Sequence, residues 1–285
     1  LTKSEAGMDS FIKNMSKTKH FKWIMFASKA LIENFVETGS EKTPSKVDIG
    51  PVNTFISKNF VDGIRLRASA RTTAKFNPHW FFEGYYAYGT KSHRSYYDAK
   101  VTYSFNKPEY QPIEFPIRTL SFESNKDVES PSDKYLVHNK DNIFMTFRPV
   151  KVEKMAFINR QKLNFMWETD YGLATSVELR TESNVPTGKL IYEKMDGSLV
   201  DKVRMTELIV GLDYRPGQSY VNSKQQRMAV NLDAPEFKIT HTMGIQNFLG
   251  SDFNTNLTEV SVYKRFWLGS WGHVDTRLQA GAQWN

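Results

Sequence analysis

Apolar and polar residues alternate one by one along most of the chain from about residue 61 onward. Residues 64–71 show the pattern clearly, because apolar side chains alternate there with polar ones that include Arg65, Arg67 and Arg71. Successive side chains of a β-strand point to opposite faces of a sheet, so this alternation predicts a strand with one apolar face and one charged face. Many strands of this kind predict an all-β protein.

The alternation predicts about ten or eleven strands of about 9 to 13 residues, the length that a tilted strand needs to cross a bilayer. The clearest patterns lie at residues 64–71, 80–88, 97–105, 162–168, 173–180, 207–214, 237–246, 259–268 and 273–284. Weaker patterns lie at residues 117–127 and 142–149. Tight turns are expected at residues 171–172 and 269–272. Residues 183–202 contain Pro186, Gly188 and the Asp196-Gly197 pair, which predict a long loop with a small hairpin of its own.

Residues 1–46 differ from the rest of the chain, since they are rich in lysine and carry an apolar stripe at helical spacing. The stripe consists of Phe21, Ile24, Phe26, Ala27, Ala30, Leu31 and Phe35. We expect an amphipathic helix that ends near Gly39, a linker at residues 40–45 and a barrel domain over residues 47–285. The helix either packs against the periplasmic mouth of the barrel or lies in the membrane interface, where Glu33 and Glu37 would weaken attraction to anionic lipid.

Composition favours a membrane protein. Only 40% of the 285 residues are hydrophobic, yet 14% are aromatic. An antiparallel transmembrane β-barrel combines both properties, because lipid-facing residues alternate with water-facing ones and aromatic girdles mark the two interfaces. The predicted interface aromatics are Trp80, Tyr88, Tyr97, Tyr103, Trp167, Tyr214 and Trp284. No stretch approaches the roughly 20 apolar residues of a spanning helix. A soluble β-rich binding module is the less favoured alternative.

The net charge of +7 suggests nucleic acid as a partner. A nucleic-acid surface would carry exposed aromatics on the same face as its cations, and these strands do not. We therefore assign the arginines to a barrel lumen, where they pair with carboxylates of neighbouring strands, and expect no nucleic-acid partner. The predicted lumen-facing residues are Arg65, Arg67, Arg71, Glu83, Asp98, Lys100, Glu178, Arg180, Glu207, Asp213, Arg265, Asp275 and Arg277.

No pattern in the sequence predicts catalysis. Cysteine is absent, which excludes disulfides, thiol nucleophiles and cysteine-based zinc sites. The six histidines are scattered without metal-ligand spacing. Asp48 and Asp62 are explained by turn capping, and neither a Gly-rich phosphate loop nor a nucleophile elbow is present. We expect no enzymatic activity, no metal site and no cofactor.

Six runs spread over residues 48–285 point to a known family. They are residues 48–54 (DIGPVNT), 59–67 (NFVDGIRLR), 82–91 (FEGYYAYGTK), 231–235 (NLDAP), 263–268 (YKRFWL) and 280–285 (AGAQWN). Together they resemble a family of Bacteroidota outer-membrane β-barrel proteins that usually carry an N-terminal carboxypeptidase-regulatory-like domain and whose barrel has no assigned function. That family is similar to the barrels of Bam-type insertases and two-partner secretion translocases, which implies a role with other envelope proteins.

Three features depart from the insertase pattern. The chain has no Arg-Gly-Phe lumen-loop motif, and residues 1–46 are too short for a periplasmic POTRA domain. It also ends at Asn285, without the terminal aromatic residue of a complete outer-membrane barrel. We therefore expect an incomplete barrel, with the regulatory-like domain and the last strands outside this chain.

These observations lead to two functional expectations. The first is a bacterial outer-membrane protein that assists assembly or translocation of envelope proteins. The second is an outer-membrane channel or transporter with a charged lumen. The expected partners are outer-membrane lipid or lipopolysaccharide and other envelope proteins.

Overall fold

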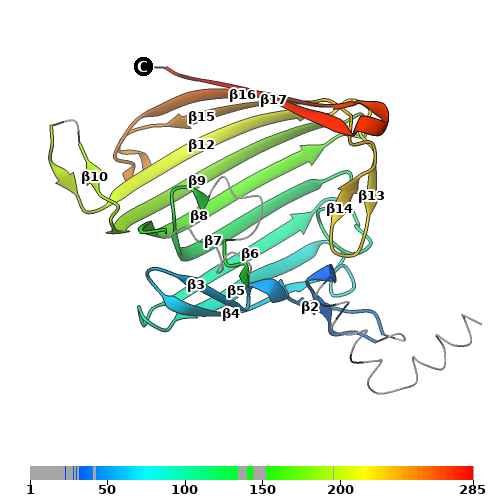
Figure 1. The fold of residues 1–285 in the computed structure, drawn as a ribbon, viewed down its shortest axis with the longest axis horizontal. Helices are drawn as coiled ribbons and strands as arrows, with labels where there is room; N and C mark the ends of the chain where they lie inside the picture. Colours follow the sequence, from blue (N-terminus) through cyan, green and yellow to red (C-terminus); the bar gives the residue numbers. More distant parts are fainter. Residues whose placement is uncertain are drawn as a thin grey trace, which may run out of the picture.

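The computed structural model describes residues 23, 28, 30, 32–40, 43–133, 140–143, 152–194 and 196–284. It is an all-β structure built around one large, curved antiparallel sheet (Figure 1). The predicted fold class is therefore confirmed. In the described part of the chain, no helix is long and apolar enough to cross a membrane, a finding that has no bearing on proteins that cross with strands.

Ten strands of 9 to 16 residues form most of the sheet. They are β4 (Gly63–Thr72), β5 (Trp80–Gly89), β6 (Ser95–Ser104), β7 (Arg118–Glu129), β8 (Lys154–Glu168), β9 (Leu173–Gly188), β12 (Val203–Tyr214), β15 (Glu236–Gly244), β16 (Thr255–Trp267) and β17 (His273–Gln283). Three short strands extend one edge: β1 (Val36–Glu37), β2 (Val47–Ile49) and β3 (Ile56–Asn59). Two separate hairpins are β10 (Tyr192–Glu193) with β11 (Leu199–Val200), and β13 (Tyr220–Asn222) with β14 (Arg227–Ala229). Three 3-10 turns are η1 (Val52–Thr54), η4 (Phe248–Gly250) and η5 (Gly269–Trp271).

Strand order in the 13-stranded sheet follows the chain, β1-β2-β4-β5-β6-β7-β8-β9-β12-β15-β16-β17, with β3 also paired to β4. Among the described strands, β17 pairs with β16 alone, and β1 at the opposite edge pairs with β2 alone. The sheet is therefore open (Figure 1), which is consistent with the incomplete barrel that the sequence predicts.

The long strands end at two rims. At one rim lie the connections 73–79, 105–117, 169–172, 215–235 and 268–272; the fourth contains β13 and β14, so we call this rim the β13 end. At the other rim lie the connections 90–94, 130–153, 189–202 and 245–254; the third contains β10 and β11, so we call this rim the β10 end. Figure 1 shows the two rims on opposite sides of the sheet.

In this sheet many large apolar side chains are exposed and many charged side chains are buried, the reverse of the distribution in a soluble sheet protein. Ile64 and Leu66 are 52% and 48% exposed, whereas Arg65 between them is 0% exposed. Among the described residues, buried polar and charged side chains outnumber buried hydrophobic ones. A small apolar cluster is formed by Ala87, Tyr96, Val128 and Met155. Polar interactions therefore hold much of the packed interior.

The N-terminal prediction was wrong at its C-terminal end. Trp23, Ser28, Ala30, Ile32 and Glu33 are helical, but the helix stops well before Gly39. Asn34 has a left-handed φ of 62°, and the next residues form β1, which pairs with β2. Strand pairing at the sheet edge thus overrides the helical spacing of the sequence. The other residues of the predicted apolar stripe before residue 32 lie outside the described residues.

Residues 183–188 also differ from the prediction, since they continue β9 instead of starting a loop. Pro186 lies opposite Ala156 of β8, but β12 pairs with β9 only as far as Asn184. Pro186 therefore lies where one side of β9 has no neighbour, and its missing N–H breaks no ladder bond there. The small hairpin predicted within residues 183–202 is present as β10 and β11.

The weak pattern at residues 117–127 was correct and corresponds to β7, whereas most of the pattern at 142–149 lies outside the described residues. Asn142 and Ile143 are described and are not in a strand. The predicted turn between β8 and β9 is tight, and Gly172 has a φ of 87° there. A Cβ at Gly172 would lie 2.3 Å from the carbonyl oxygen of Arg215, so the turn requires glycine.

Candidate functional site

Strand register places all thirteen predicted lumen-facing residues on one face of the sheet, which we call the concave face. The pairing is direct for several of them, for example Arg71 opposite Glu83 and Arg265 opposite Asp275. The others lie at even spacing from these along the same strands. We still predict, but do not observe, that this face lines a closed lumen.

Seven charged residues form a continuous row across the concave face, each directly opposite the next. They are Arg71, Glu83, Lys100, Glu123, Lys162, Arg180 and Glu207, on β4, β5, β6, β7, β8, β9 and β12. Lys162 Nζ lies 2.8 Å from Glu123 Oε1, and Arg180 Nη2 donates to Glu207 Oε2 at 2.6 Å. Five of the six neighbouring pairs have opposite charges, and such cross-strand pairs stabilise a sheet by roughly 0.2–1 kcal/mol each. The sixth, Lys162 opposite Arg180, pairs like charges, and each of these two cations has its own carboxylate, Glu123 or Glu207.

A buried ionic cluster lies beside this row, near the β10 end. Arg65 Nη1 lies 2.7 Å from Asp127 Oδ1 and 3.4 Å from Asp62 Oδ2, and all three side chains are fully buried. Asp141 Oδ1 lies 3.3 Å from Arg65 Nε, and its Oδ2 accepts a 3.0 Å hydrogen bond from Arg67. Lys140 Nζ completes the cluster at 2.8 Å from Asp127. Three carboxylates thus balance three cations, as a buried charge network requires.

Two tyrosines connect the cluster to the neighbouring strands. The hydroxyl of Tyr96 donates to Asp62 at 2.6 Å, and that of Tyr85 donates to Asp127. The guanidinium of Arg65 lies 4.6 Å from the Tyr96 ring centroid, and that of Arg67 lies 3.6 Å from the Tyr85 ring centroid. The cluster therefore joins β4, β5, β6 and β7 to Lys140 and Asp141 of the β7–β8 connection. That connection reaches the concave face.

The hairpin β13–β14, residues 220–229, crosses the concave face at the other rim, and we call it the strap (Figure 1). Arg227 forms a bidentate ion pair with Glu168 at the end of β8, with distances of 2.6 and 3.0 Å. At its tip, Lys224 Nζ binds Glu37 at 3.0 Å, and Gln225 contacts Arg71 and Asp48. A hairpin that leaves the sheet after β12 therefore reaches β1, β2 and β4.

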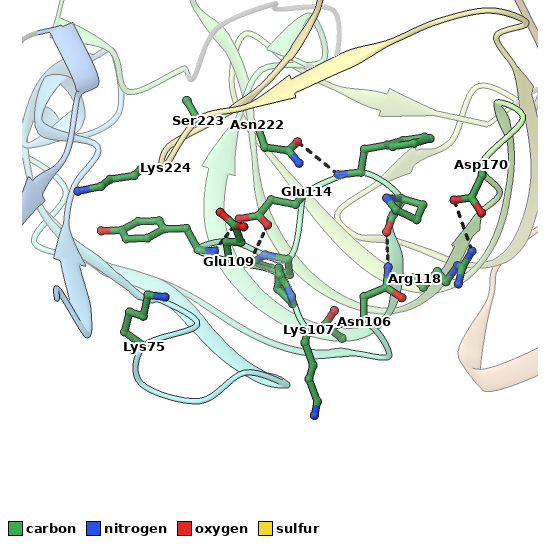
Figure 2. A pocket seen from close by; sticks show the side chains of 16 residues that line it. Lys75, Asn106, Lys107, Glu109, Glu114, Arg118, Asp170, Asn222, Ser223 and Lys224 are labelled. Atoms are coloured by element: carbon green, nitrogen blue, oxygen red, sulfur yellow. Dashed lines mark hydrogen bonds and ion pairs between the residues drawn. The ribbon is translucent and has the colours of Figure 1, made fainter.

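A cavity of about 730 Å³ lies under the strap (Figure 2). Asn222 and Lys224 of the strap lie on one side of it and the connection 105–117 on the other. Glu114 in that connection accepts hydrogen bonds from the backbone N–H groups of Glu109, Tyr110 and Gln111, at 2.6, 2.6 and 2.8 Å. This carboxylate therefore shapes the loop that forms the cavity wall.

Tyr110 links the cavity wall to the sheet edge. Its hydroxyl donates to Asp48 Oδ1 at 3.0 Å. Burial, together with the carboxylate of Asp48, raises the pKa of Tyr110 above the usual value of a phenol. The hydroxyl consequently stays protonated and remains a donor to Asp48.

The other predicted lumen residues are more dispersed. Asp98 accepts a 2.7 Å hydrogen bond from Asn125, and Asp213 pairs with Arg215 at 2.7 Å. Glu178 lies 3.5 Å from the amide of Asn164. The remaining three, Arg265, Asp275 and Arg277, lie on β16 and β17 at the far edge. Arg265 and Asp275 form a bidentate pair at 2.7 and 2.9 Å, and the guanidinium of Arg277 lies 5.5 Å from the Tyr263 ring centroid. The structure therefore does not bring these three to the buried cluster.

The seven predicted interface aromatics divide between the two rims. Trp80, Tyr103, Trp167 and Tyr214 lie at the β13 end, and Tyr88, Tyr97 and Trp284 lie at the β10 end. Phe105 joins the first group, with ring centroids 5.2 Å from Tyr103 and 6.0 Å from Trp167. Each rim of the outer face thus carries aromatic side chains.

Sequence reasoning missed several residues that hold this site together. Asp62 and Asp48 were explained as turn caps, but Asp62 also binds Arg65 and Tyr96. Asp127 follows the alternation of β7 and could have been placed on the charged face from the sequence. No local pattern identifies Asp141 or Arg227, because their partners are 76 and 59 residues away in the chain. Within the described ranges, no group of histidine and acidic side chains has an arrangement that could hold a metal ion.

Comparisons with known proteins give one result. A model of the C-terminal domain of a family of unknown function, DUF5686, matches residues 30–285. No curated protein matches the chain.

Proposed function

Because the chain belongs to the DUF5686 family of unknown function, we propose its role from its geometry: it forms a transmembrane β-barrel wall in the bacterial outer membrane and assists assembly or translocation of other envelope proteins. The family model matches residues 30–285, which include the barrel region that the sequence predicts. The Bacteroidota source and the similarity to Bam-type insertases are further parts of this proposal, and they rest on the sequence resemblance alone.

The reversed burial of the sheet is the observation that carries the membrane proposal. Large apolar residues stay exposed on the outer face in strand after strand, for example Phe122, Leu163 and Val260 at 50, 45 and 43%. Soluble proteins rarely expose apolar patches larger than a few hundred Å², because each Å² removed from water is worth about 25 cal/mol. Lipid around this face would remove that cost.

The height of the apolar band supports the same proposal. Trp80 at one rim and Tyr88 at the other are eight residues apart in β5. At about 3.3 Å per residue they are separated by roughly 26 Å along the strand, which at a tilt of about 35–45° corresponds to a height of roughly 19–22 Å. An outer-membrane barrel carries an apolar band of about 25 Å between two aromatic girdles.

The segments that cross the concave face favour an assembly role over a general pore. Lys140 and Asp141 are bound into the buried cluster, and the strap spans the β13 end through Arg227 and Lys224. An aqueous channel needs an open path, whereas these segments occupy the polar face. The sequence resemblance to insertase barrels also supports an assembly role.

A channel or transporter remains the second candidate function because of the row of seven charges. A polar, charged wall is typical of barrels with a water-filled interior. If the segments on the concave face can move, this row would become accessible to ions.

Depletion of the protein in its host tests the assembly role. We expect lower levels of unrelated barrels or surface lipoproteins in the outer membrane, measured by quantitative proteomics of isolated membranes. Unchanged levels after complete depletion would rule out the assembly role.

Conductance in planar bilayers separates the two functions. The assembly proposal predicts little or no steady current through the full-length protein. A stable, large conductance would support the channel instead.

A further inference from the structure

Exposed cations gather at the β10 end of strands β3 to β7. Lys58 lies on β3, Lys91 and Arg94 in the β5–β6 connection, and Lys126 on β7, and all four are exposed. Lys58 lies opposite Ile64 and Lys126 opposite Tyr97, which places both on the apolar outer face. We call these four cations the basic rim; Lys58 and Lys126 lie on the outer face, and Lys91 and Arg94 lie in the connection at the rim itself.

The carboxylates of the same segments do not neutralise the basic rim. Residues 56–66, 88–97 and 124–129 contain three acidic residues, Asp62, Asp127 and Glu129. Asp62 and Asp127 are buried, at 0 and 1% exposure, and both are bound to Arg65, whereas Glu129 pairs with Arg160 of β8. The exposed charge at the β10 end of these strands is therefore positive.

Aromatic side chains surround the basic rim. Lys91 Nζ lies 4.9 Å from the Phe60 ring centroid, and the guanidinium of Arg94 lies 4.0 Å from the Phe157 ring centroid. Tyr97, which is 39% exposed, lies directly opposite Lys126. Cations beside aromatic rings at the edge of an apolar surface are typical of the headgroup level of a membrane.

A hollow of about 580 Å³ with a mainly apolar surface lies on β4, β5 and β6, the central strands of the same region. Its lining includes Arg67, Glu83 and Asp98 at concave-face positions as well as residues of the outer face. Ala70, Gly84 and Ala99 lie opposite one another on these strands, and Ile49 and Tyr86 also line the hollow. The hydroxyl of Tyr86 lies 2.6 Å from Ser95 Oγ at the start of β6, one residue from Arg94. Tyr86 thus connects the lining of the hollow to the β10 end of β6.

We propose that this region binds a phospholipid whose headgroup carries a net negative charge. Cations of the basic rim contact the headgroup phosphate, and one acyl chain lies in the hollow below it. Basic residues near a membrane surface attract anionic lipids, so four together favour a headgroup of net negative charge. Charge alone would also attract free phosphate, but the adjoining hollow is complementary to a lipid. This inference rests on the proposed membrane location.

Lipid retention by the full chain tests the proposal. The protein is reconstituted in phosphatidylcholine vesicles containing phosphatidylglycerol, extracted gently and analysed by native mass spectrometry. We expect phosphatidylglycerol to be enriched over its share of the vesicle. The variant K58Q/K91Q/R94Q/K126Q should lose that enrichment, with a reduction of about tenfold or more. The matched control K75Q/K107Q/K194Q/K202Q removes four exposed cations elsewhere and should retain it.

A charge-preserving variant and three further results decide between the possible outcomes. The variant K58R/K91R/K126R keeps the charge and should bind like the wild type, which separates charge loss from misfolding. Equal loss in the control variant, or no enrichment in the wild type, would overturn the inference. Displacement of the lipid by inorganic phosphate alone would indicate a free-anion site and would also overturn it. Failure of the wild type to insert into vesicles, measured by flotation, would instead contradict the proposed function.

Discussion

Arg65 shows at the scale of a single residue why a charged side chain can occupy the packed interior of this sheet. It is 0% exposed, and three aspartates surround its guanidinium. Removing one partner of a buried charge network leaves the others uncompensated. Its role is therefore structural, whatever the sheet does as a whole.

The change Arg65→Ala should lower the free energy of unfolding by roughly 3–5 kcal/mol, because Asp62 and Asp127 would stay buried without their common cation. Urea unfolding followed by tryptophan fluorescence measures the difference. Lys107→Ala, at an exposed position, is the control and should change stability by less than about 0.5 kcal/mol. A similar effect of the two changes would contradict this account of the cluster.

At the scale of an element, each long strand places apolar side chains on the outer face of the sheet and polar side chains on the concave face. In β8, Leu163 is exposed on the outer face, whereas its neighbour Asn164 is on the concave face, close to Glu178. If lipid covers the outer face, these adjacent positions should respond oppositely to a new charge.

We expect Leu163→Arg to destabilise the protein in bilayers by roughly 2–4 kcal/mol, the cost of a cation on the lipid face near mid-membrane. Asn164→Arg, the matched control, should have little effect because Glu178 can pair with it. Folding titrations in lipid vesicles give both values. Tolerance of Leu163→Arg would indicate that water, not lipid, meets this face.

The strap is held across the sheet by a small set of contacts, among them the pairs of Arg227 and Lys224 with carboxylates and the packing of Tyr220 against Phe115. Arg227→Gln removes the bidentate pair with Glu168, and a hydrogen bond to a charged group is worth about 1.5–3 kcal/mol. We expect trypsin to cleave after Lys224 roughly ten to a hundred times faster in this variant. Met228→Ala, on the same hairpin, should leave the rate near that of the wild type. An unchanged rate in Arg227→Gln would show that other contacts hold the strap.

At the scale of the whole molecule, the absence of cysteine allows the two faces of the sheet to be labelled separately. Ile239 on β15 is 42% exposed on the outer face, and Thr240 follows it on the concave face. In bilayers, a membrane-impermeant maleimide should label Thr240→Cys and should label Ile239→Cys only after unfolding. Equal labelling of both in folded protein would contradict a membrane around the outer face.

Much of the architecture was predictable because alternation is a local signal. The residues of β4, β5 and β17, and the face on which each charged residue lies, follow from a period of two. Errors arose where pairing with distant strands decided the outcome. Phe35 fits a helical stripe, yet the chain becomes β1 immediately after it, and Pro186 suggests a loop, yet it continues β9.

The sequence by itself determined the strands, the two chemically different faces and the aromatic rims, since each depends only on neighbouring residues. Tertiary structure alone decided what covers the concave face. Asp141 reaches Arg65, and Arg227 reaches Glu168, through folds of long connections that no spacing in the chain encodes. The physical reason is that ion pairs between distant residues depend on how a connection folds back, which local alternation does not specify.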